Sequence, residues 1–368
     1  MEKILESAYQ SAIAAKDNYS FVSDTGIASK IMSVCKCETN KAPIRYLMAA
    51  LLAKTTDNSI DTRQPYPKLG NNSFAGRTID ESVVQPFIHK YALPCNDTTA
   101  FLTPAFRTIE TALTKNIFEK CRPVYVYNEM MDILDYVEVH ALESKNILIQ
   151  LIKDLIEIKR QTDETLSLMV SKLASDKKQD LSSEEITTLL IQHLQCKGSS
   201  RLPVLMFAAA YQSVRPLIHE EMKPLLAHNA ADKQTGAIGD IEIQLLNDNK
   251  TVTCYEMKKK QVTTDDIFVC VEKIGKLSIK PDNYIIITTE AITKEVKDLA
   301  YTFYDKIGVE IAVLDCIGFI NHFLHFFHRY RLSFLNNYQT LVLQEPTSSV
   351  SQPLKEAFLS LRKVAECE

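Results

Sequence analysis

The chain contains no tryptophan, and only 9 of its 368 residues are glycine. So little glycine argues against a collagen-like repeat or a glycine-rich barrel. The first residues, MEKILESAYQ, lack the charged stretch followed by an apolar stretch that marks a secretory signal peptide. No apolar run approaches the length needed to cross a bilayer, and LPVLMFAAAY from Leu202 is among the longest. These absences predict a cytoplasmic, globular protein without a membrane span.

Cysteine content indicates the cellular compartment, and the net charge indicates which kinds of partner to expect. The nine cysteines show no disulfide-framework spacing, which fits reduced thiols in a cytoplasm. Cys35 and Cys37 form a lone Cys-x-Cys, and without a second pair at zinc spacing no metal role is expected there. The net charge of −4 at pH 7 disfavours a protein that coats nucleic acid, although it allows a local basic cleft for DNA.

Residues 1–200 have the periodicity of a mostly helical N-terminal region. Apolar residues recur at steps of three and four over residues 4–15, 44–54 and 127–142. A longer amphipathic stretch covers residues 146–172, and its apolar stripe fits either a helix-bundle core or a dimer seam.

Residues 55–108 differ in composition from the helices around them. The segment holds five prolines, two glycines and many Asn, Ser and Thr residues, and it is too long and too aromatic for a linker. Long ordered loops on a rigid scaffold often bind a ligand, and basic and amide side chains contact DNA phosphates and base edges. The segment therefore fits either a cap over the helices or a DNA-reading surface, with candidate contacts at Arg63, Lys68, Asn71, Asn72, Arg77 and Arg107.

After residue 200 helices alternate with strands. A helical run from Pro203, with a kink expected at Pro216, precedes a hairpin. Strands separated by helices imply a mostly parallel sheet with right-handed crossovers. We expect an α/β fold, α+β overall, in which residues 201–335 form a mixed sheet flanked by helices and residues 336–368 form a C-terminal tail with a helix. The expected helices cover residues 264–276, 294–306 and 317–330, and the expected strands cover residues 284–289 and 309–314.

The hairpin, GDIEIQLLNDNKTVTCYEMKKK over residues 239–260, carries the most informative residues. Asp240 opens the first strand, and Glu256 and Lys258 project from one face of the second because side chains at i and i+2 of a strand point the same way. Pairing of the two strands brings Asp240 close to Glu256. Two carboxylates and an ammonium suit a Mg²⁺ site for phosphodiester hydrolysis, and the alternative is a hairpin with solvated charges.

The spacing of Asp240, Glu256 and Lys258 resembles the PD-(D/E)xK nuclease superfamily, with glycine in place of the proline and Glu-Met-Lys as the second half. The order of helix, hairpin, helix and strand over about residues 203–314 also resembles the core of that superfamily. The resemblance implies that Asp240, Glu256 and the carbonyl of Met257 bind Mg²⁺. It implies that Lys258 orients or deprotonates the attacking water, or neutralises charge on the phosphate.

The same resemblance extends the candidate site. Many members of the superfamily add a carboxylate from the preceding helix, and Glu221 is favoured over Glu220 because it shares the apolar helix face of Ile218. Strand alternation returns Lys260 to the active face, where Lys260 and Gln261 are candidate contacts to DNA phosphate.

Two stretches together resemble the SacI family of type II restriction endonucleases over about residues 40–330. They are KLGNNSFAGRTIDESVVQPFI with LPCNDTTAFLTPAFRT, and AIGDIEIQLLNDNKTVTCYEMKKKQVTTDDI. The resemblance implies Mg²⁺-dependent cleavage of double-stranded DNA at a short palindrome, GAGCTC for that family, with a cognate DNA methyltransferase that protects the host. A repair or junction-processing nuclease and an inactive DNA-binding protein are the alternatives on the same fold.

A palindrome presents two scissile phosphates related by a dyad, so we expect a homodimer on DNA. The candidate seams are the stripe over residues 147–158 and the C-terminal helix, which carries Leu354, Phe358, Leu361 and Val364 at helical spacing. Either stripe could instead pack on its own subunit.

Overall fold

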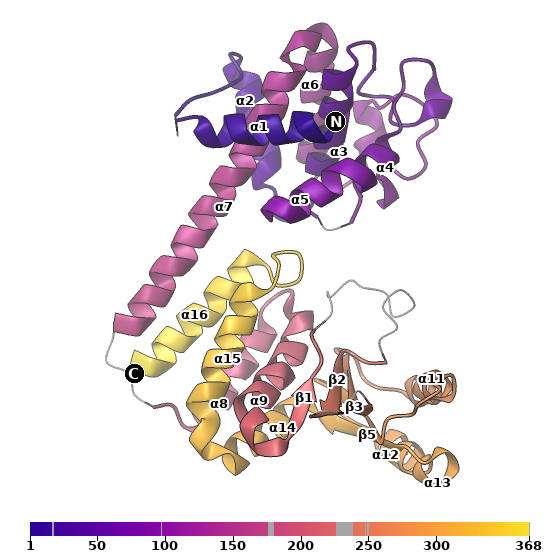
Figure 1. Ribbon diagram of the computed structural model, residues 1–368, viewed down its shortest axis with the longest axis vertical. Helices are drawn as coiled ribbons and strands as arrows, with labels where there is room; N and C mark the ends of the chain where they lie inside the picture. The colour runs from indigo at the N-terminus through magenta and orange to yellow at the C-terminus, as the bar shows by residue number, and fades with distance from the viewer. Residues whose placement is uncertain are drawn as a thin grey trace. The chain divides into compact units, whose positions relative to one another are not determined.

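The computed structural model describes residues 1–16, 18–96, 98–175, 180–225, 238–246, 248 and 250–367 (Figure 1). The fold is α/β: a mostly helical part reaches residue 218, and a five-stranded mixed sheet with helices between its strands follows. The chain divides into two compact units, Met1–Thr165 and Leu166–Glu368. Within the described residues, no helix combines the length and the apolar character needed to span a bilayer.

The first unit is built around α3 (Ala42–Thr56), whose residues from Ala42 to Lys54 are all buried. The other long helices of this unit are α1 (Glu2–Ala14), α2 (Thr25–Lys36), α6 (Val124–Val139) and the first part of α7 (Ser144–Ser175). Inside the unit, the ring of Tyr46 stacks on that of Phe106 with 4.7 Å between centroids. Phe106 comes from the 55–108 segment, so that segment contributes directly to the core.

A buried ion pair fixes the 55–108 segment to α3. The segment folds into short helical pieces, among them α4 (Gly76–Ile79), the π-helical η2 (Asp80–Val84) and α5 (Gln85–Tyr91). Arg45 on α3 and Asp80 on η2 are both fully buried and form an ion pair at 2.8 Å. The second carboxylate oxygen of Asp80 accepts hydrogen bonds from the hydroxyl of Thr99 and the backbone N–H of Ala100. Both oxygens of this buried carboxylate therefore have partners, and loss of either ion would leave the other buried and unpaired.

The second unit contains a sheet with the strand order β1-β2-β3-β4-β5. The strands β1 (Glu220–Met222), β2 (Ile241–Leu245) and β3 (Thr251–Lys258) pair antiparallel, and β3, β4 (Asn283–Thr288) and β5 (Glu310–Asp315) pair parallel. The mixed sheet expected from the sequence is confirmed. It is not mostly parallel, because the short strand β1 adds a second antiparallel pair beside the hairpin.

Helices cover both faces of this sheet (Figure 1). Tyr255 and Ile287 point into a core shared with α9 (Leu202–Ile218), α14 (Cys316–Phe326) and α15 (Arg331–Gln344). Cys254 and Ile286, one residue earlier on the same strands, point into a core shared with α11 (Thr264–Gly275) and α12 (Lys294–Tyr301). From Thr253 onward, the alternation of strand side chains therefore assigns the residues of β3 to one of two environments. At Val252, where the register with β2 shifts, the alternation is interrupted, and Val252 packs in the same core as Tyr255.

The boundary between the units lies inside α7, whereas the sequence analysis placed it after residue 200. Leu173 and the helix α8 (Ser183–Gln195) belong to the core of the second unit. The helix α16 (Gln352–Cys367) belongs there too, because Leu354 and Phe358 are buried in the same core.

The two candidate dimer seams are mostly occupied within their own units. In the stripe of α7, Ile147, Leu151 and Leu155 are fully buried in the first unit. In α16, Leu354 and Phe358 are buried, and Val364 is 55% exposed. Packing on the same subunit is therefore the correct interpretation for the buried residues of both stripes.

Candidate functional site

The β2–β3 hairpin places Asp240 beside the end of β3. Ile241 pairs with Tyr255, so Asp240, one residue earlier, lies beside Glu256. The carboxylate oxygen Oδ2 of Asp240 accepts a hydrogen bond from the backbone N–H of Met257 at 2.7 Å. The two halves of the motif, 16 positions apart in the sequence, therefore meet at one point.

Gly239 allows this close approach. A Cβ atom at this position would lie 2.7 Å from the carbonyl oxygen of Tyr255 on the neighbouring strand. Such a contact is far inside van der Waals distance, so only glycine fits without a shift of the hairpin. The local geometry thus explains why a glycine precedes Asp240.

Glu256 and Lys258 form the centre of the site. Lys258 Nζ lies 2.6 Å from Glu256 Oε1, and the two side chains are 24% and 23% exposed. The hydroxyl of Tyr284 donates a hydrogen bond to Oε2 of the same carboxylate, and Lys273 Nζ lies 3.8 Å from that oxygen. Each oxygen of Glu256 therefore has a defined partner.

These contacts shift the ionisation of both central groups. Burial alone would raise the pKa of Glu256, but hydrogen bonds from Lys258 and Tyr284 and the charges of Lys258 and Lys273 outweigh it and lower the pKa. Burial alone would lower the pKa of Lys258, but its hydrogen bond and attraction to Glu256 outweigh that effect and raise the pKa. Glu256 is therefore an anion, and Lys258 is a cation, at neutral pH.

Asp266 is a further carboxylate that the sequence analysis did not single out. It occupies the third position of α11 and forms a capping box with Thr263. Its Oδ1 lies 3.2 Å from Lys260 Nζ and 3.9 Å from Lys258 Nζ. The sequence signal that could have found it is the Thr-x-x-Asp spacing of Thr263 and Asp266, which begins three residues after Lys260.

The neighbouring lysines follow the expected alternation. Lys259 turns away and donates to the hydroxyl of Ser199 at 2.8 Å. Lys260 is 65% exposed beside Asp266, and Gln261 is exposed as well. The structure therefore brings Lys260 to the site and separates Lys259 from it.

The sequence predicted Glu221 to lie on a helix, but the structure places it on a strand. Helix α9 ends at Ile218, His219 takes a left-handed conformation with φ 51°, and Glu221 follows on strand β1. Its carboxylate accepts from Arg215 at 2.7 Å, and its backbone pairs with Gln244. Gln244 is four residues along β2 from Asp240, roughly 13 Å at about 3.3 Å per residue, so the structure does not bring Glu221 to the site.

Asp240 and Glu256 fit a hydrated Mg²⁺ ion better than a closed protein cage. No group of three or more His, Cys, Asp or Glu side chains in the described part of the chain is placed to hold a metal. Mg²⁺ commonly takes one or two carboxylates and completes its shell with water and phosphate oxygens. Met257, whose carbonyl was the expected third ligand, lies in β3 with its N–H bound to Asp240.

The charges around the site are balanced. The carboxylates of Asp240, Glu256 and Asp266 lie among the ammonium groups of Lys258, Lys260 and Lys273. A bound divalent cation would therefore give this group of residues a net positive charge, which favours a phosphodiester anion.

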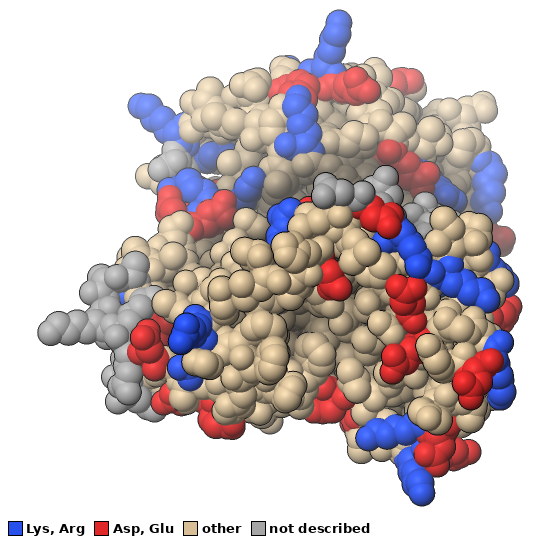
Figure 2. Space-filling view, turned by 60° about the horizontal axis from the view of Figure 1, so that its bottom comes forward, with Lys and Arg blue, Asp and Glu red and all other residues tan. Residues whose placement is uncertain are grey.

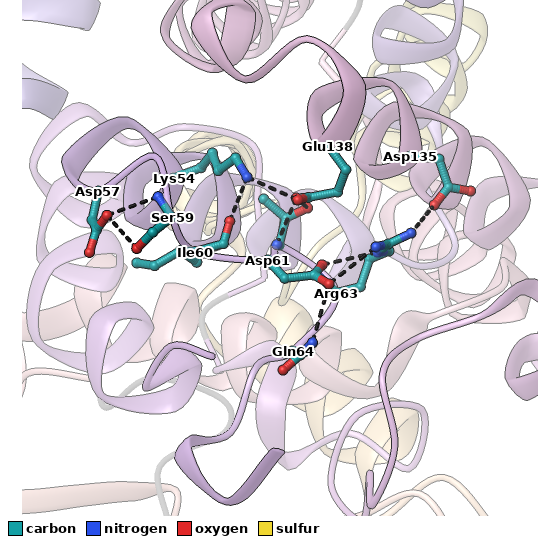
Figure 3. Close-up of polar contacts among 10 residues, drawn as sticks. Lys54, Asp57, Ser59, Ile60, Asp61, Arg63, Gln64, Asp135 and Glu138 are labelled. Carbon is teal, nitrogen blue, oxygen red and sulfur yellow. Dashed lines mark hydrogen bonds and ion pairs between the residues drawn. The ribbon is translucent and has the colours of Figure 1, made fainter. Parts of the chain in front are cut away.

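In the first unit, Arg63 is held in a network of acidic side chains (Figure 3). Its guanidinium lies 3.0 Å from Asp61 and 3.1 Å from Asp135 on α6. The hydrogen bond to Asp61 raises the pKa of Arg63, although burial opposes that effect. Lys54 and Glu138 form a second ion pair of this network at 2.9 Å. The ion pairs of Arg63 therefore hold the chain that follows α3 against α6.

The other candidate DNA contacts in this unit are exposed. Arg77 forms an i,i+4 ion pair with Glu81 at 2.8 Å. The backbone N–H of Asp61 donates to the carbonyl of Asn72 at 2.7 Å and so closes a loop. The side chains on the outside of this region are Lys68, Asn71, Asn72 and Arg107.

On the face of the molecule shown in Figure 2, basic and acidic side chains are interspersed among larger uncharged areas. This mixture agrees with the small net charge of −4.

Searches against protein-family models and among curated proteins found no match to this chain.

Proposed function

We propose that this protein is a Mg²⁺-dependent nuclease that hydrolyses phosphodiester bonds of double-stranded DNA. The observation that carries the proposal is the convergence of Asp240, Glu256 and Lys258, with the Lys258–Glu256 contact at 2.6 Å and the Asp240–Met257 contact at 2.7 Å. An exposed hairpin with merely solvated charges would not need these partners or the close approach at Gly239.

Each residue has a distinct role in this proposal. Asp240 and Glu256 would hold the ion, which when bound would polarise the phosphate and activate a water molecule. Lys258, held beside Glu256 in the structure, would orient or deprotonate the attacking water, or neutralise charge on the phosphate. Lys260, 65% exposed at the rim, would contact the phosphate backbone.

We extend the proposal to a type II restriction endonuclease that cuts a short palindrome as a homodimer, with a DNA methyltransferase as its functional partner. Its support is the sequence resemblance to the SacI family, for which the implied site is GAGCTC. The anchored segment of the first unit, with Lys68, Asn71 and Asn72 exposed, supplies side chains of the type that read DNA.

The lysine run supplies a matched pair of variants for the test. Lys258→Met removes the ammonium beside Glu256, and Lys259→Met removes one that binds Ser199. Plasmid cleavage in Mg²⁺ should fall by about 10²–10³ for Lys258→Met, the usual cost of losing one group that stabilises developing charge. Lys259→Met should cut at nearly the wild-type rate. Equal cleavage by both variants would remove Lys258 from the proposed site.

A further inference from the structure

The hydroxyl of Tyr284 lies between the two halves of the candidate site. Tyr284 is fully buried on β4, and its hydroxyl donates to Glu256 Oε2. The same hydroxyl lies 3.2 Å from the carbonyl oxygen of Ile238. A phenol is protonated at neutral pH, so this hydroxyl is a hydrogen-bond donor to Glu256.

Ile238 connects this hydroxyl to the Asp240 half of the site. It precedes Asp240 by two residues, and its N–H donates to Glu242 Oε1 at 2.6 Å. The peptide that leads into Asp240 is therefore held by Glu242 on one side and faces Tyr284 on the other.

The two oxygens of Glu256 differ in how firmly their partners are held. Oε2 faces a phenol whose ring is packed in the core with Ile286 and Cys270. Oε1 faces Lys258, whose long flexible side chain is 24% exposed and already lies 3.9 Å from a second acceptor, Asp266. Oε1 is therefore the oxygen whose partner can be exchanged at low cost.

We propose that Tyr284 is a positioning residue of the metal site: it fixes Glu256 Oε2, so that Oε1 is the oxygen presented to a divalent cation while Lys258 moves toward Asp266. This inference rests on the proposed function, because it assumes that Glu256 binds Mg²⁺. Groups that orient a metal-binding carboxylate commonly contribute 10–100-fold to metal affinity, and loss of the Tyr284 hydroxyl should weaken binding by about tenfold or more.

The experiment compares Tyr284→Phe with Tyr211→Phe. Each change removes one phenol oxygen and keeps the ring, but the Tyr211 hydroxyl contacts Tyr255 at 2.8 Å on the opposite face of the sheet. Mg²⁺ binding to the DNA-free protein is measured by calorimetry, after thermal unfolding shows that both variants are folded. We expect at least tenfold weaker Mg²⁺ binding for Tyr284→Phe and wild-type binding for Tyr211→Phe. Replacement of Tyr284 by p-aminophenylalanine, which keeps a donor at that position, should restore the affinity.

The possible failures are distinguishable. If the wild type binds Mg²⁺ and Tyr284→Phe binds it equally well, Tyr284 only fills space and this inference alone is overturned. If the wild type itself binds no Mg²⁺, the inference and the metal assignment of the proposed function fail together. If Tyr284→Phe does not fold, the p-aminophenylalanine variant decides, because weakened binding by that folded protein would refute a positioning role for the donor.

Discussion

Among the basic residues proposed to contact DNA, the structure distinguishes Arg63, which is held in ion pairs, from residues whose side chains are exposed. Arg63 is bound by Asp61 and Asp135, whereas Lys68 and Arg107 are exposed. We predict that Lys68→Ala combined with Arg107→Ala reduces the salt dependence of DNA binding, and that Arg63→Ala does not. Arg63→Ala should instead lower the free energy of unfolding, by up to about 1 kcal/mol for partly exposed pairs.

The size of the effect follows from counterion release. Each phosphate contact contributes about 0.9 to the slope of log K against log salt, so loss of two contacts should flatten the slope by about 1.8. Between about 50 and 200 mM salt, a fourfold range, the affinities of the wild type and the double variant should therefore converge by roughly tenfold.

Fluorescence anisotropy of a labelled duplex, titrated at several salt concentrations, measures these slopes. A double variant with the wild-type slope would show that the segment is only a cap over the helices. An Arg63→Ala slope as flat as that of the double variant would show that its carboxylate partners release Arg63 to the DNA. Either result would refute the division made from the ion pairs of Figure 3.

Three further predictions concern the scaffold. Gly239→Ala should lower the free energy of unfolding by about 1–3 kcal/mol in chemical denaturation, because its Cβ would lie 2.7 Å from the Tyr255 carbonyl oxygen. An unchanged denaturation midpoint would contradict the close approach. Asp80→Ala should cost about 3–5 kcal/mol in the same assay, because it leaves Arg45 buried without its partner, and a loss below 1 kcal/mol would contradict that role. Burial lowers the pKa of His193 to about 4, below the value near 6.5 of an unfolded chain, so the unfolded state binds more protons. The free energy of unfolding should therefore fall by about 3 kcal/mol as the pH drops from 6.5 to 4. In urea unfolding, His193→Gln should lack this pH-dependent loss. An equal pH dependence in the wild type and His193→Gln would refute the assignment.

Sequence patterns predicted the elements whose signals are local. The expected helix over residues 264–276 matches α11, Thr264–Gly275, whose first turn carries the capping box of Thr263 with Asp266. The expected strand over residues 284–289 matches β4, Asn283–Thr288, because a continuous apolar run between turn residues suits a strand buried on both faces. The approach of Asp240 to Glu256 also followed from local rules, since hairpin pairing and strand alternation determine it.

The remaining features depend on tertiary pairing that no local pattern encodes. Tyr284 reaches Glu256 because β3 and β4 pair in parallel with Cys254 opposite Tyr284, and this register has no signature in either strand alone. Glu221 was assigned to a helix because its spacing from Ile218 fits a helical face. The left-handed turn at His219 directs the chain to the sheet edge instead.

Cleavage of supercoiled plasmid DNA by the purified wild type and by Glu256→Gln, each with Mg²⁺ or with EDTA, tests the central claim most directly. Glutamine keeps the size of Glu256 and removes the charge that pairs with Lys258 and would hold the ion. The account predicts discrete fragments from the wild type in Mg²⁺, intact DNA in EDTA, and cleavage by Glu256→Gln reduced by several orders of magnitude. Cleavage by Glu256→Gln at the wild-type rate, or no cleavage by the folded wild type in Mg²⁺ on DNA that contains GAGCTC and other palindromes, would contradict it.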